Sequence, residues 1–186
     1  KKLTDKTVCK AAIEKKHKSI STLSADFSES TYSSMFKTPK KGSGTLHYKK
    51  KDKIRWEHTA PNKQVILING KTVKLSENGK EVTNATSKQV VKKIQNMMVQ
   101  MISGDFLNEK DFTIAYYENN SNYKLVLTPK NDRMKKYINH VDLIFDKKAL
   151  TLKEMTMAES DTEKVVYTFS NTKLNETIND SKFTTL

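Results

Sequence analysis

The sequence predicts an α+β fold in which about ten antiparallel strands curl into a barrel or half-barrel, with helices covering its open side. Apolar residues recur at helical spacing as far as residue 23 and at every second position from residue 24 onward. A second helical pattern covers residues 87–102, and strand patterns occupy most of the chain after it. Because no Ser/Gly-rich or Pro-rich linker divides the 186 residues, we expect a single domain over residues 1–186.

The first helix is predicted from Asp5 to Leu23, where lysines occupy the face opposite the apolar residues. The apolar stripe consists of Cys9, Ala12, Ile13, Ile20 and Leu23. A cysteine in such a stripe is typical of a buried structural thiol. It is the chain's one cysteine, so the fold has no internal disulfide.

Strands follow from residue 24 to residue 82. Leu46 and Tyr48 alternate with polar residues, as do Ile54 and Trp56, which indicates half-buried strands whose apolar side chains share one face. The apolar run at 65–68 is followed by two Asn-Gly dipeptides, at 69–70 and 78–79. Asn-Gly supplies the positive φ angles of a type I′ hairpin turn, so we expect a three-stranded meander here.

The second helix is predicted over 87–102 and should end at Gly104. Its apolar positions are Val90, Val91, Ile94, Met97, Met98, Met101 and Ile102. Methionine is flexible and polarizable, so a Met-rich apolar face can repack around ligands of variable shape. The remaining strands are predicted at 112–117, 123–127, 137–145, 150–157 and 164–169, with a last extended piece at 182–186.

The charge balance indicates an anionic partner. Thirty-four Lys and Arg residues against 21 Asp and Glu leave a net charge of +13, which would favour nucleic acid, an anionic lipid surface or an acidic protein. The run Lys49–Lys53, flanked by Tyr48 and Trp56, has the cations and stacking rings of a nucleic-acid-binding module. A solvated hairpin turn is the simpler interpretation of the same run, and we favour it.

Signs of catalysis are absent from the sequence. The four histidines, at 17, 47, 58 and 140, have no metal-ligand spacing, so we expect no metal site and no cofactor. There is no nucleophile elbow and no phosphate-binding loop, and the Gly42-Ser43-Gly44 segment is interpreted as a turn. The sequence therefore predicts a binding protein and no catalytic residues.

An ordered set of segments along the chain carries a family resemblance. The segments are Leu23–Ser28, Gly44–Lys49, Arg55–Glu57 with Pro61, Val65–Thr72, the Met-rich helix, Leu125–Pro129 and Asp180–Phe183. In this order they resemble the LolA family of periplasmic lipoprotein carriers. The resemblance implies an unclosed antiparallel β-barrel with helices forming a lid over its concave face. It also implies a monomeric carrier that ferries lipoprotein acyl chains through the periplasm, from a releasing complex in the inner membrane to an acceptor at the outer membrane. We accordingly expect that a signal peptide has been removed.

Site residues follow from this resemblance together with the strand phases. We expect the lipid-binding cavity to be lined by Phe27, Leu46, Tyr48, Ile54, Trp56 and Ile66, and the lid to present Val90, Ile94, Met97, Met98 and Met101. The family's lid-fastening arginine falls by position on Lys50, whose ammonium we expect to point inward and to bind carbonyls at a helix end. A carrier of another lipid on the same fold and a nucleic-acid-binding module remain the alternatives.

Overall fold

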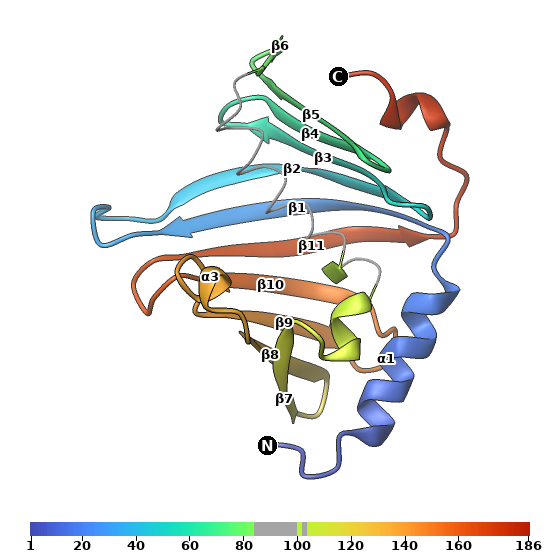
Figure 1. Ribbon diagram of the computed structural model, residues 1–186, viewed down its shortest axis with the longest axis vertical. Coiled ribbons are helices and arrows are strands. Elements are labelled where there is room, and N and C mark those ends of the chain that lie inside the picture. Colours follow the sequence, from blue (N-terminus) through green and yellow to red (C-terminus); the bar gives the residue numbers. More distant parts are fainter. Residues whose placement is uncertain (84–99, 102–103) are drawn as a thin grey trace. The chain divides into compact units, whose positions relative to one another are not determined.

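The computed structural model describes residues 1–83, 100–101 and 104–186 of the chain. In this part of the chain eleven strands form one sheet, in the order β6-β5-β4-β3-β2-β1-β11-β10-β9-β8-β7 (Figure 1). The strands are β1 (Thr22–Tyr32), β2 (Lys40–Lys49), β3 (Lys53–Ala60), β4 (Gln64–Asn69), β5 (Thr72–Glu77), β6 (Lys80–Glu81), β7 (Phe112–Glu118), β8 (Asn122–Pro129), β9 (His140–Asp146), β10 (Leu152–Ala158) and β11 (Lys164–Leu174). The helical elements are α1 (Thr7–Ser19), η1 (Asp105–Asn108), α3 (Asp132–Lys135) and η2 (Asp180–Phe183).

The strand order confirms the predicted fold class. Neighbouring strands from β2 to β6 and from β7 to β11 pair antiparallel. β6 and β7 end the order on its two sides, so the sheet is unclosed. Consecutive strands joined by a connecting turn or loop pair with each other in most of this order, whereas β1 and β11 are neighbours that lie far apart in sequence.

The chain divides into two compact units. The first comprises Lys1–Lys16, Ser28–Lys41 and Phe106–Phe169, and the second His17–Phe27, Gly42–Asp105 and Ser170–Leu186. Strands β1, β2 and β11 each contribute residues to both units. The chain therefore passes between the units within strands, which explains why the sequence contains no linker; a single domain over residues 1–186 stays a prediction.

Helix α1 is shorter than predicted. It begins at Thr7, whose amide donates to the Asp5 carboxylate at 2.8 Å, and it ends at Ser19. Cys9 and Ile13 are buried as expected, whereas Leu23 lies in β1 and is only half-buried. Burial raises the pKa of the Cys9 thiol to about 11, so the thiolate is disfavoured at neutral pH.

The core of the first unit follows from strict alternation along β7, β8 and β9. Ile114 pairs with Leu127, which also pairs with Val141, and all three side chains are buried. Two residues farther along the strands, Tyr116 pairs with Leu125, which also pairs with Leu143. These strands were predicted from the same alternation, and their register aligns the apolar sets of three successive strands on one face.

Two predicted extended segments differ from the structure for the same reason: the strand predicted at 137–145 forms but starts later, and the piece predicted at 182–186 is wrong. The strand predicted from Tyr137 begins at His140, because α3 precedes it, and the predicted piece at 182–186 overlaps the 3-10 helix η2. Each helix starts at an Asn-Asp dipeptide. The side chains of Asn131 and Asn179 accept hydrogen bonds from the amides two residues onward, which caps these short helices.

The hairpin turns confirm the meander and correct one detail. Asn78 and Gly79 both have positive φ, 50° and 79°, between the paired residues Glu77 and Lys80, as a type I′ turn requires. In the preceding hairpin Asn69 is still paired, so the turn residues are Gly70 and Lys71, and only Gly70 has a positive φ.

The second predicted helix lies largely outside the described residues, including Val90, Ile94, Met97 and Met98. Gln100 and Met101 are helical, and Met101 is buried. The Gly104 amide donates to the carbonyl of Gln100 at 3.0 Å, and Gly104 has φ +83°, the conformation typical of a glycine that follows a helix.

Candidate functional site

Six apolar side chains predicted to line a cavity come together in the second unit. Leu46 and Tyr48 from β2 pair with Trp56 and Ile54 from β3, and Trp56 pairs in turn with Ile66 of β4. Directly paired residues point to the same side of a sheet, so these five share one face. We call the set Phe27, Leu46, Tyr48, Ile54, Trp56 and Ile66 the apolar face. Each of its members is at most 7% exposed.

Phe27 joins the apolar face from β1 through aromatic packing. Its ring centroid lies 4.8 Å from that of Trp56 and 5.1 Å from the ring of His58. Gly44 makes room for this ring, because a Cβ at position 44 would lie 2.6 Å from Phe27 Cζ. Gly42-Ser43-Gly44 is therefore a strand segment of β2 and not the turn expected from the sequence.

Two further residues extend the apolar face beyond the predicted set. Ile68 pairs with Ile54 and Leu75 pairs with Ile66, and both are buried. The period-two rule could have found Ile68, which lies two positions after Ile66. Burial also raises the pKa of the Tyr48 phenol, so the apolar face carries no charge from this group at neutral pH.

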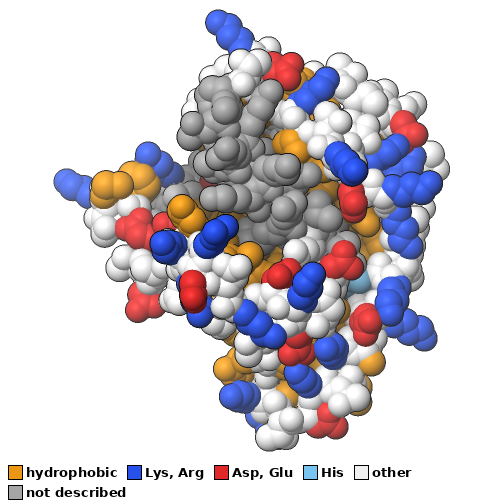
Figure 2. Space-filling view, in the orientation of Figure 1, with side chains coloured by type: hydrophobic (Ala, Val, Ile, Leu, Met, Phe, Trp, Pro, Cys, Tyr) orange, Lys and Arg blue, Asp and Glu red, His pale blue; other side chains and the backbone are white. Residues whose placement is uncertain are grey.

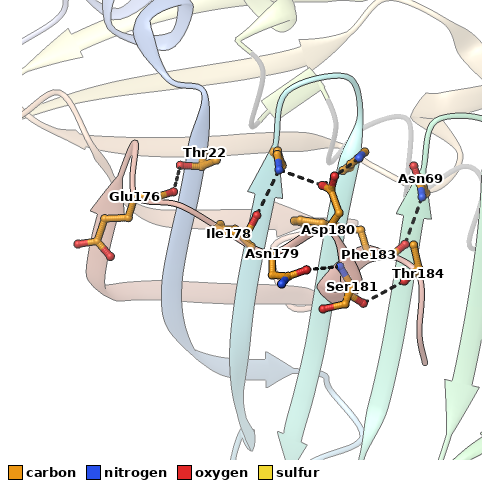
Figure 3. Close-up of polar contacts among 11 residues, drawn as sticks. Thr22, Asn69, Glu176, Ile178, Asn179, Asp180, Ser181, Phe183 and Thr184 are labelled. Atoms are coloured by element: carbon orange, nitrogen blue, oxygen red, sulfur yellow. Dashed lines mark hydrogen bonds and ion pairs between the residues drawn. The ribbon is translucent and has the colours of Figure 1, made fainter.

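Residues 178–185, which we call the C-terminal segment, lie on the side of β3 and β4 that is opposite the apolar face (Figure 3). An Arg55 terminal nitrogen donates to the carbonyls of Lys182 and Thr185, at 3.3 and 2.6 Å. The Asn69 side chain donates to the carbonyl of Phe183 at 3.4 Å, as Figure 3 shows. Phe183 is fully buried. These contacts explain why all four residues from 65 to 68 are buried, because both faces of β4 are covered.

A shallow pocket of about 330 Å³ lies beside this segment. Its lining consists of Leu67, Asn69, Thr72, Lys74, Phe183 and Thr184. Leu67 and Lys74 are paired and point away from the apolar face. The pocket is open to solvent and partly polar, which does not suit the sequestration of an acyl chain.

The run Lys49–Lys53 forms an exposed turn at Lys50, Lys51 and Asp52, as expected, but the two lysines at its ends are paired within the chain. The ammonium groups of Lys49 and Lys53 lie 2.9 and 3.1 Å from one Asp180 carboxylate oxygen (Figure 3). Lys49 also donates to the carbonyl of Ile178. These partners lower the pKa of Asp180 below its ordinary 3.8, so the ion pairs persist at neutral pH. Two of the run's four lysines are therefore paired with Asp180, which leaves fewer cations for phosphate groups than the sequence suggested.

Lys50 binds a carbonyl at a helix end, as expected, and the helix is α1. Its Nζ donates at 2.8 Å to the carbonyl of Lys18, in the last turn of α1, and its amide donates to the carbonyl of Ser21. Carbonyls in the last turn of a helix lack partners within the helix. The side chain is exposed, so the expected inward direction is wrong: β2 ends at Lys49, and Lys50 belongs to the turn.

The described residues contain no group of His, Cys, Asp or Glu side chains arranged to hold a metal ion. Burial, reinforced by the charges of Lys182 and Arg55, lowers the pKa of His47. Within the same residues no helix is both long and apolar enough to cross a membrane.

Comparison with known proteins finds relatives described as outer-membrane lipoprotein carrier proteins. An outer-membrane lipoprotein carrier protein of Coxiella burnetii (strain CbuK_Q154) is 26% identical over 163 residues, which cover 87% of this chain and 75% of the relative. The protein of the same description from Pseudomonas paraeruginosa (strain DSM 24068 / PA7) is 25% identical over 169 residues, covering 88% and 76%.

Among solved structures, that of MucB resembles the chain in fold. The crystal structure of MucB aligns with a TM-score of 0.50 at 6% identity, over 95% of this chain and 62% of that one. A LolA superfamily protein from Nitrosomonas europaea aligns with a TM-score of 0.47 at 14% identity, over 93% and 96%. The family model described as outer membrane lipoprotein carrier protein LolA matches residues 18–185. Since that match spans nearly the whole sequence, the chain belongs to the LolA family.

Proposed function

We propose that this chain is a periplasmic, monomeric carrier that holds the acyl chains of a lipoprotein against the apolar face and ferries them from the inner to the outer membrane. The observation that carries the proposal is the position of six large apolar side chains on one face of β1 to β4, in a chain of the LolA family. Burying acyl chains there would contribute roughly 0.8 kcal/mol per methylene group. A releasing complex and an outer-membrane acceptor are part of the proposal.

Binding requires the apolar face to be uncovered, because its residues are buried in this structure. We place the lid on the helix predicted over 87–102, through Val90, Ile94, Met97, Met98 and Met101. Met side chains suit this role since they repack around chains of different length. The acceptance of other lipids is the second candidate, because the apolar face carries no feature that selects the passenger's head group.

A pair of adjacent variants tests the role of the apolar face. Ile66 and Leu67 are both buried but point to opposite sides of β4, the first beside Trp56 and the second into the pocket at Phe183. Ile66→Thr is expected to weaken binding of a fluorescent fatty acid about tenfold, since it removes apolar contact and adds a hydroxyl. Leu67→Thr should lower stability similarly and leave binding within about twofold of wild type.

The measurement uses energy transfer to the probe from Trp56, the single tryptophan, which lies within the apolar face. Equal loss of affinity in the two variants would show that binding follows general stability and not this face. Native mass spectrometry of the chain purified from periplasm, with an acylated protein passenger or a free lipid attached, decides between a lipoprotein carrier and a carrier of another lipid.

Lys50 is proposed to act as a latch through its bond to the end of α1. Lys50→Leu removes the donor to the Lys18 carbonyl and is expected to alter the release rate of the acyl probe by about fivefold, with binding at equilibrium changed less. Amides in the last turn of α1 should also exchange faster with solvent. Lys51→Leu, at the neighbouring exposed position, is the matched control. Equal effects of the two variants on release would leave Lys50 with no role in closure.

A further inference from the structure

The hairpin between β1 and β2 ends in an exposed apolar tip, formed by residues 32–41, which we call the β1–β2 tip. Tyr32 and Met35 belong to it and are 36% and 83% exposed, and Phe36 is half-buried. In the described part of the chain only four large hydrophobic side chains are exposed, and this tip holds two of them. Figure 1 shows the hairpin projecting at the left of the view.

The tip is also strongly basic. Lys37, Lys40 and Lys41 lie within it, and residues 32–41 contain no acidic residue. In Figure 2 the left margin of the same view shows hydrophobic atoms flanked by those of Lys and Arg. Two lysines also pack on aromatic rings: Lys40 Nζ lies 4.0 Å from the Phe36 ring centroid, and Lys164 Nζ lies 5.3 Å from that of Tyr32.

Local contacts hold the tip in this form. The amide and hydroxyl of Ser34 donate to one Glu163 carboxylate oxygen, at 2.7 and 2.8 Å, and the amide of Phe36 donates to the carbonyl of Ser33 at 3.0 Å. The hydrogen bonds from Ser34 lower the pKa of Glu163, so its carboxylate stays ionised, and bound to Ser34, to a lower pH than an ordinary glutamate. The turn is thus braced, and the Met35 side chain remains in solvent at its apex.

We propose that the β1–β2 tip docks the carrier on an anionic phospholipid surface, with Met35 and Phe36 entering the interface and the lysines binding lipid phosphates. Exposed apolar side chains ringed by lysines match the composition of segments that bind such surfaces. A protein partner fits less well, because stable protein interfaces take roughly 20–30 residues from each side and this tip offers about ten. The contact would be weak and reversible, as a soluble carrier needs.

This docking goes beyond lipid carriage, since it uses no residue of the apolar face and does not depend on the passenger. Each lysine near an anionic surface strengthens partition about fivefold. Three lysines and two inserted apolar side chains suffice for transient binding at low ionic strength. They contribute too little for permanent attachment.

Flotation of the empty chain with vesicles tests the proposal. The chain is expected to float with phosphatidylcholine vesicles that contain phosphatidylglycerol, to remain behind with pure phosphatidylcholine, and to dissociate as salt is raised. Met35→Asp and Lys37→Glu should each lower the partition coefficient about tenfold or more. Equal binding to both kinds of vesicle, or no binding to either, would overturn the proposal.

The chain offers matched controls for both variants. Val8 is 74% exposed on α1, so Val8→Asp places the same charge on an equally accessible apolar position elsewhere. Lys71→Glu makes the charge reversal of Lys37→Glu at the exposed β4–β5 turn. Both controls should leave partition within about twofold of wild type. If they reduce it as much as the tip variants do, net charge and not the tip governs binding.

A second measurement reports insertion itself. The lone cysteine, Cys9, is buried and has a pKa of about 11, so a cysteine introduced by Met35→Cys can be labelled selectively with an environment-sensitive dye. Its emission is expected to shift to the blue with phosphatidylglycerol vesicles, whereas a dye introduced through Val8→Cys should not respond. No shift from position 35, or equal shifts from both positions, would contradict insertion of the tip.

Discussion

Alanine in place of Gly44 is expected to destabilise the chain by about 3 kcal/mol or more, because β2 has no space for a side chain there. An ideal Cβ at this position would lie 2.0 Å from the carbonyl oxygen of Glu57 and 2.6 Å from Phe27 Cζ. The nearest obstacle is backbone, so β2 and β3 would have to move apart. Denaturation in urea measures the change, and fluorescence of Trp56 follows the packing of Phe27 against it.

Gly70→Ala is the matched control for Gly44→Ala. Nothing lies within 4 Å of a Cβ at position 70, but φ is +59°, so the cost is conformational and about 1 kcal/mol. Gly44 is not among the glycines with positive φ, so its cost is steric. If the two substitutions cost the same, the close approach of Phe27 and Glu57 to Gly44 is not what requires glycine at this position.

The apolar face was largely predictable because it depends on local periodicity. Alternation in β2 and β3 placed Leu46, Tyr48, Ile54 and Trp56 on one side, and antiparallel pairing keeps them there. The position of Phe27 on the apolar face was also predicted. The need for a glycine at position 44, next to the Phe27 ring, was not. A strand glycine beneath an aromatic ring depends on which strands become neighbours, and periodicity within one strand carries no such information.

The C-terminal segment could not be predicted by the same rules. Its contacts join residues more than 100 positions apart in sequence, as between Arg55 and Lys182, and they involve backbone carbonyls that any sequence supplies. The run Lys49–Lys53 was interpreted as a solvated turn for this reason. Its partner Asp180 lies in a capped helical turn that the strand pattern concealed.

The interior of the first unit was predictable because its contacts join strands that are neighbours in sequence, unlike those of the C-terminal segment. Strands β7, β8 and β9 pair in sequence order, although residues 130–139 separate β8 from β9, so apolar alternation in each strand was enough. The start of β9 was wrongly predicted at Tyr137 because the connection before it begins with the short helix α3, which an Asn-Asp dipeptide caps. Asn-Asp before a polar segment would have been the signal for a short helix at both places.

Phe183→Ala is expected to lower the free energy of unfolding by about 3–4 kcal/mol, which corresponds to a fall in melting temperature of roughly 10 °C for a chain of this size. The reason is packing: Phe183 is fully buried, whereas the ion pairs of Asp180 are solvent-exposed and contribute little. Asp180→Ala should therefore cost less than about 1 kcal/mol. Thermal unfolding followed by circular dichroism measures both.

The control for Phe183→Ala is Phe36→Ala, at the half-buried position in the β1–β2 tip, which should change stability by less than about 1 kcal/mol. A double-mutant cycle with Leu67→Ala then tests the contact itself, because Leu67 and Phe183 line the same pocket. Residues in contact usually show coupling of about 0.5–3 kcal/mol. Additive losses would mean that Leu67 and Phe183 do not stabilise each other. A Phe183→Ala effect no larger than that of Asp180→Ala would mean that the buried ring is not what holds the C-terminal segment on β3 and β4.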